Sequence, residues 1–269
     1  GLPFTPGSEA AGIVEATGDG VGEVRVGQRV AYAGPLGSYA ERRIVPARAL
    51  VPLPDTVSDE QAAAMMLKGM TAQYLLRQTY VVKPGDTILF HAAAGGVGLI
   101  ACQWAKHLGA TVIGTAGSTD KAELARAHGC DHVILYKQED VAARVREITG
   151  GKGVPVVYDG VGKATFTASL DSLQPRGLLA SFGNASGAVE AFNLGILSQK
   201  GSLYVTRPTL VTYTATRDQL LASAADLFDV VGSGKVRIEI NQRFPLERAA
   251  DAHRALESRE TTGSTVLIP

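Results

Sequence analysis

The stretch Leu89-Phe90-His91-Ala92-Ala93-Ala94-Gly95-Gly96-Val97-Gly98 decides the fold, because it sets small residues between an apolar strand and a helix. The run 87–93 has the length of a strand, and apolar residues at helical spacing follow it. Backbone N–H groups at the start of such a helix are free to bind a pyrophosphate, and only minimal side chains allow that approach. The turn therefore predicts a dinucleotide site, with a purely structural turn as the alternative. Its residues would be Ala93, Gly95, Gly96, Val97 and Gly98.

Strands and helices alternate on the carboxyl side of this turn. Short apolar runs predict strands at 110–116, 132–136, 154–161, 177–183 and 201–208. Amphipathic segments between them predict helices at 119–129, 139–150 and 164–173. Buried strands joined by crossover helices require a doubly wound parallel sheet, so we predict an α/β fold of the Rossmann type.

The two ends of the chain have a different pattern. Gly-rich breaks separate expected strands at 10–18, 25–34 and 38–46, and a helix is expected from Asp59 with Ser58 as its N-cap. The carboxyl end predicts a helix at 216–231, a strand at 237–244, a helix at 246–258 and a strand at 264–269. No linker separates these parts, so we expect a second, β-rich domain assembled from both ends of the chain.

The residues after the second strand indicate which dinucleotide binds. An NAD site would offer an acidic residue to the ribose 2′-hydroxyl about 20 residues past the glycines. The expected strand at 110–116 ends without an acidic residue, and we expect Asp120 to cap the helix that follows it. Gly117 leaves room for a phosphate to which Ser118 and Lys121 can donate, and Tyr136 can reach the same phosphate. The residues therefore favour NADPH, although Lys121 as a solvated lysine and Tyr136 as a packing residue remain alternatives.

Composition excludes several classes of protein. Lys and Arg number 26 and Asp and Glu number 26, so no net charge attracts nucleic acid or acidic lipid. Two cysteines, Cys102 and Cys130, cannot form a disulfide framework, which favours a cytoplasmic protein. No apolar run is long enough for a membrane span.

Four segments carry a resemblance to a known family: residues 7–12 (GSEAAG), 67–76 (LKGMTAQYLL), 91–110 (HAAAGGVGLIACQWAKHLGA) and 181–187 (SFGNASG). Together they closely resemble the quinone oxidoreductases, zinc-free medium-chain dehydrogenases/reductases of the zeta-crystallin type, over essentially the whole chain. The resemblance implies a β-rich GroES-like catalytic domain beside the Rossmann domain. It also implies that further strands, with the substrate-binding Asn and tyrosines, precede residue 1, so the catalytic residues are not assigned in this sequence.

The resemblance also implies roles for particular residues. Lys68, Gly69 and Thr71 would lie beside the nicotinamide, although Lys68 as a solvated lysine and Thr71 as a helix-packing hydroxyl are alternatives. Phe182, Gly183 and Asn184 would bracket the same end of the cofactor. Arg259 would lie close to the adenosine phosphate, with a surface salt bridge as its alternative.

No metal site is expected. The zinc alcohol dehydrogenases of the same superfamily have a zinc-binding His at the position of Ser8, and a serine hydroxyl does not replace an imidazole. The sequence also has no Cys/His cluster and no catalytic triad with a nucleophile elbow. We therefore expect an enzyme that orients the nicotinamide against an electrophilic carbon instead of polarising the substrate with zinc.

The expected enzyme is an NADPH:quinone oxidoreductase with a small-molecule quinone substrate. Its domains would be a first catalytic part at 1–69, an NADP-binding Rossmann domain at 70–208 and a second catalytic part at 209–269. The resemblance implies a homodimer formed through the last Rossmann strand, in 201–208. A reductase of α,β-unsaturated aldehydes or ketones shares every cofactor motif and is the nearest alternative. An NADPH-binding crystallin-like or RNA-binding protein is the alternative from another class.

Overall fold

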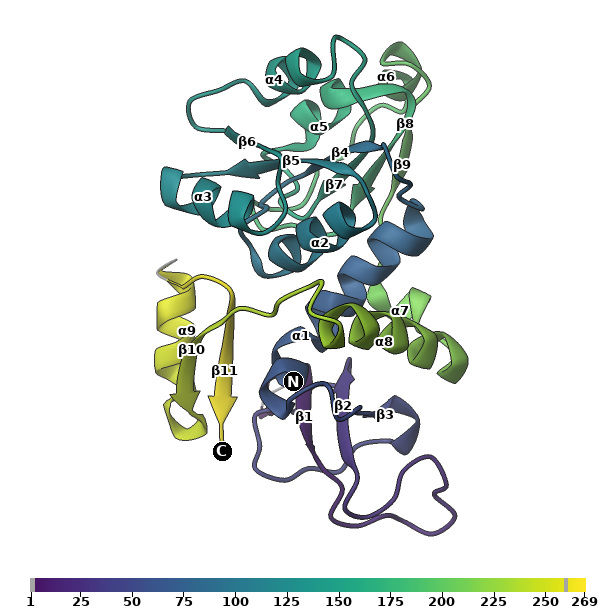
Figure 1. Ribbon diagram of the computed structural model, residues 1–269, viewed down its shortest axis with the longest axis vertical. Helices are drawn as coiled ribbons and strands as arrows, with labels where there is room; N and C mark the ends of the chain where they lie inside the picture. Colours follow the sequence, from purple (N-terminus) through teal and green to yellow (C-terminus); the bar gives the residue numbers. More distant parts are fainter. Residues whose placement is uncertain (1–2, 259–260) are drawn as a thin grey trace. The chain divides into compact units, whose positions relative to one another are not determined.

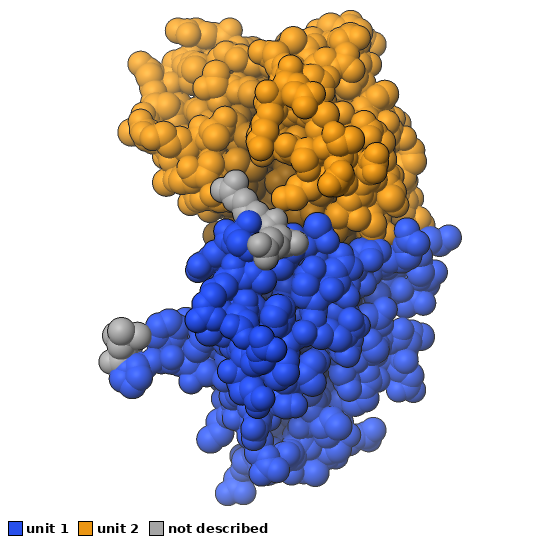
Figure 2. All heavy atoms as spheres, turned by 90° about the vertical axis from the view of Figure 1, so that its left-hand side faces the viewer, with its two compact units in different colours: residues 1–71, 210–269 blue, residues 72–209 orange. Residues whose placement is uncertain are grey.

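The computed structural model describes residues 3–258 and 261–269 and divides the chain into two compact units. One unit comprises residues 1–71 and 210–269, and the other comprises residues 72–209 (Figure 2). We call them the terminal unit and the central unit. Arg259 lies outside the described residues, so its expected role has no structural counterpart here.

A six-stranded parallel sheet forms the middle of the central unit (Figure 1). Its spatial order is β6-β5-β4-β7-β8-β9, so the order reverses between β4 and β7. The strands are β4 Thr87–Phe90, β5 Thr111–Ala116, β6 His132–Leu135, β7 Val154–Asp159, β8 Leu173–Ser181 and β9 Tyr204–Thr206. The prediction of a doubly wound parallel sheet is confirmed. In such sheets ligands bind where the strand order reverses, outside the carboxyl ends of the strands.

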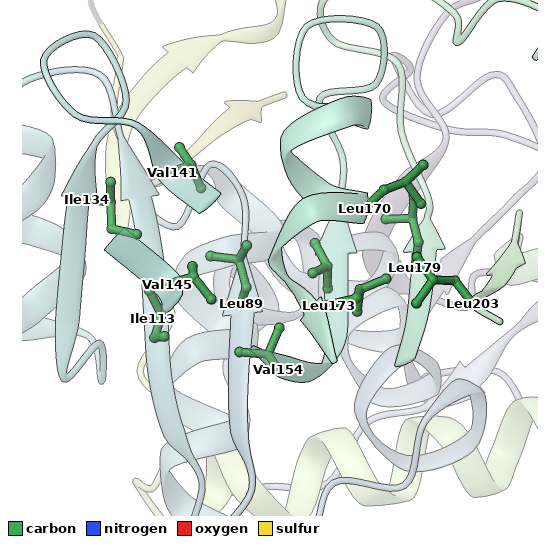
Figure 3. Close-up of a cluster of buried hydrophobic side chains, with 11 residues drawn as sticks. Leu89, Ile113, Ile134, Val141, Val145, Val154, Leu170, Leu173, Leu179 and Leu203 are labelled. Carbon is green, nitrogen blue, oxygen red and sulfur yellow. The ribbon is translucent and has the colours of Figure 1, made fainter. Parts of the chain in front are cut away.

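Helices cover both faces of this sheet, α2 and α3 on one and α4 and α5 on the other (Figure 1). Their bounds, with the short α6, are α2 Gly96–His107, α3 Thr119–Ala127, α4 Val141–Ile148, α5 Phe166–Ser172 and α6 Gly195–Gln199. One face is filled by branched aliphatic side chains from the strands and from α4 and α5, among them Leu89, Ile113 and Val145, each 0% exposed (Figure 3). This packing fixes the strand ends that carry the candidate site.

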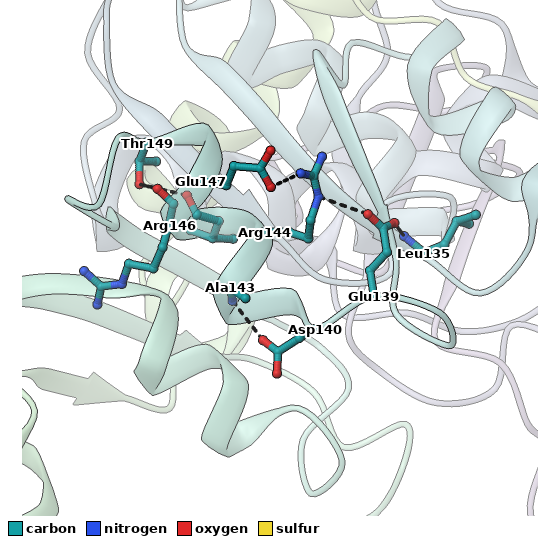
Figure 4. A network of polar contacts seen from close by, with 9 residues as sticks. Leu135, Glu139, Asp140, Ala143, Arg144, Arg146, Glu147 and Thr149 are labelled. Atoms are coloured by element: carbon teal, nitrogen blue, oxygen red, sulfur yellow. Dashed lines mark hydrogen bonds and ion pairs between the residues drawn. The ribbon is translucent and has the colours of Figure 1, made fainter.

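Side-chain hydrogen bonds fix the start of α4 (Figure 4). Asp140 caps the helix by accepting from the N–H of Ala143 at 2.8 Å. Glu139 accepts from the N–H of Leu135 at 2.7 Å and forms an ion pair with Arg144 Nε at 3.0 Å. The Nη1 atom of Arg144 forms a second ion pair, with Glu147. The end of β6 and the start of α4 are thereby tied together.

The terminal unit contains two small sheets. β1 Glu9–Ile13, β2 Arg29–Ala33 and β3 Val51–Pro52 form an antiparallel sheet in that order, and β10 Ile240–Pro245 pairs in parallel with β11 Ser264–Ile268. Its helices are α1 Asp59–Tyr74, whose last residues belong to the central unit, α7 Leu210–Tyr213, α8 Arg217–Gly232 and α9 Ala249–Glu257. This unit also has the short turns η1 Ala47–Ala49 and η3 Leu246–Arg248, whereas η2 Leu75–Thr79, which follows α1, belongs to the central unit.

Several boundaries expected in the terminal unit are confirmed. Ser58 accepts from the N–H of Gln61 at 3.2 Å, as an N-cap of α1 does. Thr216 caps α8 in a capping box with Gln219. α1 approaches α8 closely at Gly69, where an added Cβ would lie 2.5 Å from Leu227.

The expected strand at 38–46 is wrong. The N–H groups of Gly37 and Tyr39 donate to Gly7 and Pro6, at 2.8 and 3.0 Å, as parts of a tight turn. The Arg43 side chain donates to the carbonyls of Pro35 and Leu36 and so folds back on the same turn. The segment pairs with no strand within the described residues.

Candidate functional site

The turn between β4 and α2 leaves the start of a helix without a side-chain cap. Gly95 is the N-cap residue, and the first helical bond is from the N–H of Leu99 to Gly95 at 2.9 Å. The N–H groups of the three preceding helical residues therefore have no helical carbonyl to which they can donate. The next two helices of this sheet, α3 and α4, are capped by Ser118 and Asp140. The α2 terminus thus combines free donors with the positive end of the helix dipole, the arrangement that binds a phosphate.

Small residues at this turn are required by close backbone contacts. A Cβ added to Gly98 would lie 2.5 Å from the carbonyl oxygen of Ala92, and one added to Gly95 would lie 3.1 Å from it. In the neighbouring strand, a Cβ on Gly114 would lie 2.7 Å from both Ala93 Cβ and Cys130 Sγ. The first turn of α2 is therefore packed directly on the end of β4, and larger side chains would close the space that a pyrophosphate needs.

Four residues expected near the 2′-phosphate come together at the ends of β5 and β6. An added Cβ at Gly117 would lie 2.6 Å from the Tyr136 hydroxyl oxygen, so the two residues touch. Ser118 is the N-cap of α3, and its Oγ accepts from the N–H of Lys121 at 3.4 Å. Its hydroxyl proton remains able to donate to a ligand. Lys121 has no ion-pair partner among the described residues, and Tyr136 is 52% exposed.

The expectation that Asp120 caps α3 is wrong. The helix begins at Thr119, and Asp120 lies within its first turn, where a carboxylate is favoured by the helix dipole but does not cap. Ser118 is the residue with extended backbone that precedes the helix, and its side chain therefore reaches the free N–H of Lys121.

Phe182, Gly183 and Asn184 follow the carboxyl end of β8 and pack on the turn after β7. The N–H groups of Phe182 and Gly183 donate to the Asp159 carbonyl at 2.8 and 3.3 Å. A Cβ on Gly183 would lie 2.4 Å from the carbonyl oxygen of Gly160, and the Phe182 ring lies 5.8 Å from the Phe90 ring. These three residues thus occupy the same edge of the sheet as the turn after β4.

Lys68 and Thr71 belong to α1, in the terminal unit. Lys68 is ion-paired with Glu9 at 3.2 Å and has a side chain only 26% exposed, so it is not a solvated helix lysine. Glu9 also accepts from the N–H of Leu67 at 2.8 Å. The Thr71 hydroxyl donates to the Leu67 carbonyl at 2.7 Å, which is the contact of a helix-packing hydroxyl. Their placement beside a nicotinamide stays a prediction.

Sequence reasoning missed a tyrosine of the terminal unit. The Tyr39 hydroxyl lies 3.2 Å from His253 Nε2, and the two rings make an edge contact at 5.8 Å. Burial, and then the charge of Glu9, raise the pKa of Tyr39. The hydroxyl of Tyr39 therefore holds its proton more firmly than a free tyrosine does. The two residues are 214 positions apart, so no local pattern indicates the pair.

A buried polar cluster beneath the carboxyl edge of the central sheet was also missed. His91, Thr115, Asp159 and Ser169 are each at most 2% exposed. Burial lowers the pKa of His91 below its usual range, although the charge of Asp159 opposes that shift. Thr115 and Ser169 contact the two ring nitrogens of His91 at 3.2 and 3.0 Å, so His91 is a hydrogen-bonded core residue.

No three His, Cys, Asp or Glu side chains in the part of the chain that the structure describes are grouped to hold a metal ion. Within the same residues, no helix is both long and apolar enough to cross a membrane.

Comparison with known proteins places these features in a family. The profile described as "Alcohol dehydrogenase GroES-like domain" matches residues 1–55, and that described as "Zinc-binding dehydrogenase" matches residues 96–226. A quinone oxidoreductase of Pseudomonas aeruginosa is 62% identical over 100% of this chain and 83% of its own length. A 2-haloacrylate reductase of a Burkholderia species is 49% identical over 99% of this chain and 81% of its own length.

A solved structure gives the same result for the fold. The quinone oxidoreductase of Escherichia coli, complexed with NADPH, superimposes with a TM-score of 0.97 at 54% sequence identity. It is matched over 100% of this chain and 83% of that one. The GroES-like character expected of the terminal unit is confirmed by the profile match over residues 1–55.

Proposed function

The chain belongs to the quinone oxidoreductase family of zinc-free medium-chain dehydrogenases/reductases, and from that membership we propose that it catalyses the NADPH-dependent reduction of quinones. The observation that carries the proposal is the α2 terminus, which has free N–H donors and Gly95 in place of a capping side chain. A second anion site, at Ser118 and Lys121, lies at the end of the neighbouring strand β5. Two anion sites on adjacent strands suit a dinucleotide with a pyrophosphate and a 2′-phosphate.

The residues proposed to bind NADPH follow the carboxyl edge of the central sheet. Ala93, Gly95, Gly96, Val97 and Gly98 would hold the pyrophosphate. Gly117, Ser118, Lys121 and Tyr136 would hold the 2′-phosphate, and Phe182, Gly183 and Asn184 would contact the nicotinamide end. Lys68 and Thr71 of the terminal unit are proposed for that end as well, and Arg259 for the adenosine phosphate.

Hydride transfer from NADPH to a quinone requires the protein mainly to orient the two reactants. NADPH, when bound, supplies a hydride from its nicotinamide. Quinones accept a hydride readily because the product ring is aromatic and its negative charge spreads over two oxygens. The protein then needs to hold the cofactor in one orientation and exclude water, which close backbone packing at Gly98 and Gly183 favours. Ser8, where zinc relatives have a ligating histidine, agrees with a reaction that does not use zinc.

Two further properties are proposed with the function. We expect a cytoplasmic enzyme, since both cysteines are unpaired thiols. We also expect a homodimer formed along β9, which is an edge strand of the central sheet and presents Tyr204 with 61% exposure. An exposed edge strand pairs readily with a second copy across a twofold axis.

A reductase of activated carbon–carbon double bonds is the second candidate. It is favoured by the 49% identity to a 2-haloacrylate reductase, which covers 99% of this chain. Conjugated acids and carbonyls accept a hydride at the β carbon, so the same cofactor site would serve both reactions.

Relative rates with the two substrate classes test the proposal. NADPH oxidation is measured with 1,4-benzoquinone, with a 2-alkenal and with 2-chloroacrylate, each corrected by a protein-free blank. We expect the quinone to give the highest kcat/KM. A higher kcat/KM for the alkenal or the chloroacrylate would assign the enzyme to double-bond reduction, and no turnover with any of them would refute the reductase function.

A further inference from the structure

A chain of hydrogen bonds runs under the carboxyl edge of the central sheet and joins the turns that follow three of its strands. Thr115 lies on β5, His91 directly after β4, Asp159 at the end of β7 and Ser169 on α5. Their contacts are Thr115 Oγ1 to His91 Nδ1 at 3.2 Å, His91 Nε2 to Ser169 Oγ at 3.0 Å and Ser169 Oγ to Asp159 Oδ2 at 2.8 Å. We call this chain the relay.

The Asp159 end fixes the direction of the bonds from Asp159 to His91. The Asp159 carboxylate only accepts, so Ser169 donates its proton to Oδ2 and accepts from His91 Nε2–H. At the other end, Thr115 Oγ1 accepts from the N–H of Ala92 at 3.1 Å and lies 3.2 Å from His91 Nδ1. Because burial lowers the pKa of His91, we assign it the neutral ring with its proton on Nε2, and Nδ1 then accepts the Thr115 hydroxyl proton. Each hydroxyl in the relay both accepts and donates one hydrogen bond.

The Thr115 end holds a strained residue of the phosphate-binding turn. Ala92 has φ of 53°, in the left-handed region that strains a residue with a Cβ. Its N–H is held by Thr115, and its carbonyl accepts from the N–H of Gly95 at 2.9 Å. The conformation of Ala92 thereby places the N-cap residue of α2.

The Asp159 end holds the turns on the nicotinamide side. Asp159 Oδ1 accepts from the N–H groups of Val161 and Gly162 at 2.8 and 3.0 Å. Its backbone carbonyl accepts from Phe182 and Gly183. One buried carboxylate therefore fixes the turn after β7 and, through its own backbone, the turn after β8.

We propose that His91 is a positioning residue for the dinucleotide, and that the relay through Thr115, Ser169 and Asp159 holds the pyrophosphate turn and the nicotinamide turns in one fixed arrangement. The inference rests on the proposed function, because it assigns the relay a role in binding NADPH. Apolar side chains of the same size would fill this space without directed bonds. One end of the polar relay bonds the N–H of Ala92, which adjoins the proposed pyrophosphate residues. The other end bonds the turn after β7, on which Phe182 and Gly183 pack.

The tautomer is tested by NMR of the unmodified protein. In a two-dimensional 15N–1H spectrum of the histidine side chains, His91 is expected to show a protonated Nε2 and an unprotonated Nδ1. A His91→Gln variant identifies its signals. The Nδ1–H tautomer, or a doubly protonated ring at neutral pH, would overturn the relay without any reference to cofactor binding.

The role in binding is tested with two pairs of variants. Thr115→Val keeps the shape of the side chain but removes the hydroxyl, and Thr115→Ser restores it. Ser169→Ala breaks the relay, and Ser172→Ala is its control, because Ser172 is equally buried on α5 and donates only to the Ala168 carbonyl. Affinity is measured for NADPH and for 2′-AMP, which has the 2′-phosphate but no pyrophosphate or nicotinamide.

We expect Thr115→Val and Ser169→Ala to weaken NADPH about tenfold, with 2′-AMP unchanged, and the two control variants to bind like the wild type. Melting temperatures are measured beside the affinities. A lower melting temperature with unchanged NADPH affinity would show a merely structural relay and overturn the proposal. Failure of the wild type to bind either ligand would instead refute the proposed function, while the NMR result still decides the tautomer.

Discussion

Single residues decide the identity of the cofactor in this account. The sequence predicts Gly117, Ser118, Lys121 and Tyr136 near one phosphate, and the structure brings them to one corner of the sheet. They could be predicted together because they follow the carboxyl ends of β5 and β6, which are neighbouring parallel strands. The relay could not be predicted in the same way, because residues 91, 115, 159 and 169 meet only through the register of three strands and a helix.

Lys121→Ala should weaken NADPH about tenfold and leave NADH affinity within a factor of two, because only NADPH has the phosphate that the ammonium group binds. Dissociation constants for both dinucleotides check this. Lys152→Ala is the control, since Lys152 is exposed and lies just before the amino end of β7, away from the carboxyl ends of the strands. Equal weakening of both dinucleotides would remove Lys121 from the 2′-phosphate site.

Gly98→Ala should lower the free energy of unfolding by about 2 kcal/mol and abolish measurable NADPH binding. The added Cβ would meet the carbonyl oxygens of Ala92 and Ala93 at 2.5 and 2.6 Å, and these are backbone atoms that cannot turn away. Urea denaturation and NADPH titration measure the two effects. Gly18→Ala is the control, since a Cβ there meets no atom within 4 Å. Wild-type NADPH affinity in Gly98→Ala would contradict the account of the turn.

The two cysteines should not react with thiol reagents in the folded protein, although exposed thiolates add readily to quinones. Cys102 and Cys130 are both buried, and a hydrogen bond with Cys130, followed by burial, raises the pKa of Cys102 well above its usual value. At pH 8 Cys102 therefore remains a thiol. Intact mass after iodoacetamide treatment should show no adduct in native protein and two in urea. An adduct on the native protein would contradict this.

At the scale of elements, predictions succeeded where the sequence specifies its own boundary. Ser58 and Thr216 cap helices because each has a side chain that reaches a free N–H three residues on. The expected strand at 38–46 is wrong because a strand needs a pairing partner, and the backbone at Gly37 and Tyr39 is held in a turn by Gly7 and Pro6. The expected helix at 246–258 is divided into η3 and α9.

Thr216→Ala should destabilise the protein by about 1 kcal/mol, because α8 loses the side chain that accepts from the N–H of Gln219. Thr216→Ser keeps a hydroxyl at the cap and should be close to the wild type. Urea denaturation compares the three proteins. Equal stability of Thr216→Ala and Thr216→Ser would mean that the cap contributes nothing.

At the scale of the whole molecule, the alternation of strands and helices predicts the parallel sheet, and the glycine turn where the strand order reverses predicts where a ligand binds.

The oligomeric state is tested against the mass of one chain, which is 28.1 kDa. Light scattering should give twice the chain mass for the wild type and the single mass for Tyr204→Lys on β9. His132→Lys, on the opposite edge strand β6, should remain dimeric. A monomeric wild type would refute the proposed dimer.

NADPH bound at the carboxyl edge of the central sheet should reduce a quinone. This is tested by kcat/KM for 1,4-benzoquinone reduction with NADPH and with NADH, in the same preparation. We expect at least about a tenfold preference for NADPH, which is the contribution expected of one charged contact to the 2′-phosphate. Equal rates with the two dinucleotides, or none with NADPH, would contradict it.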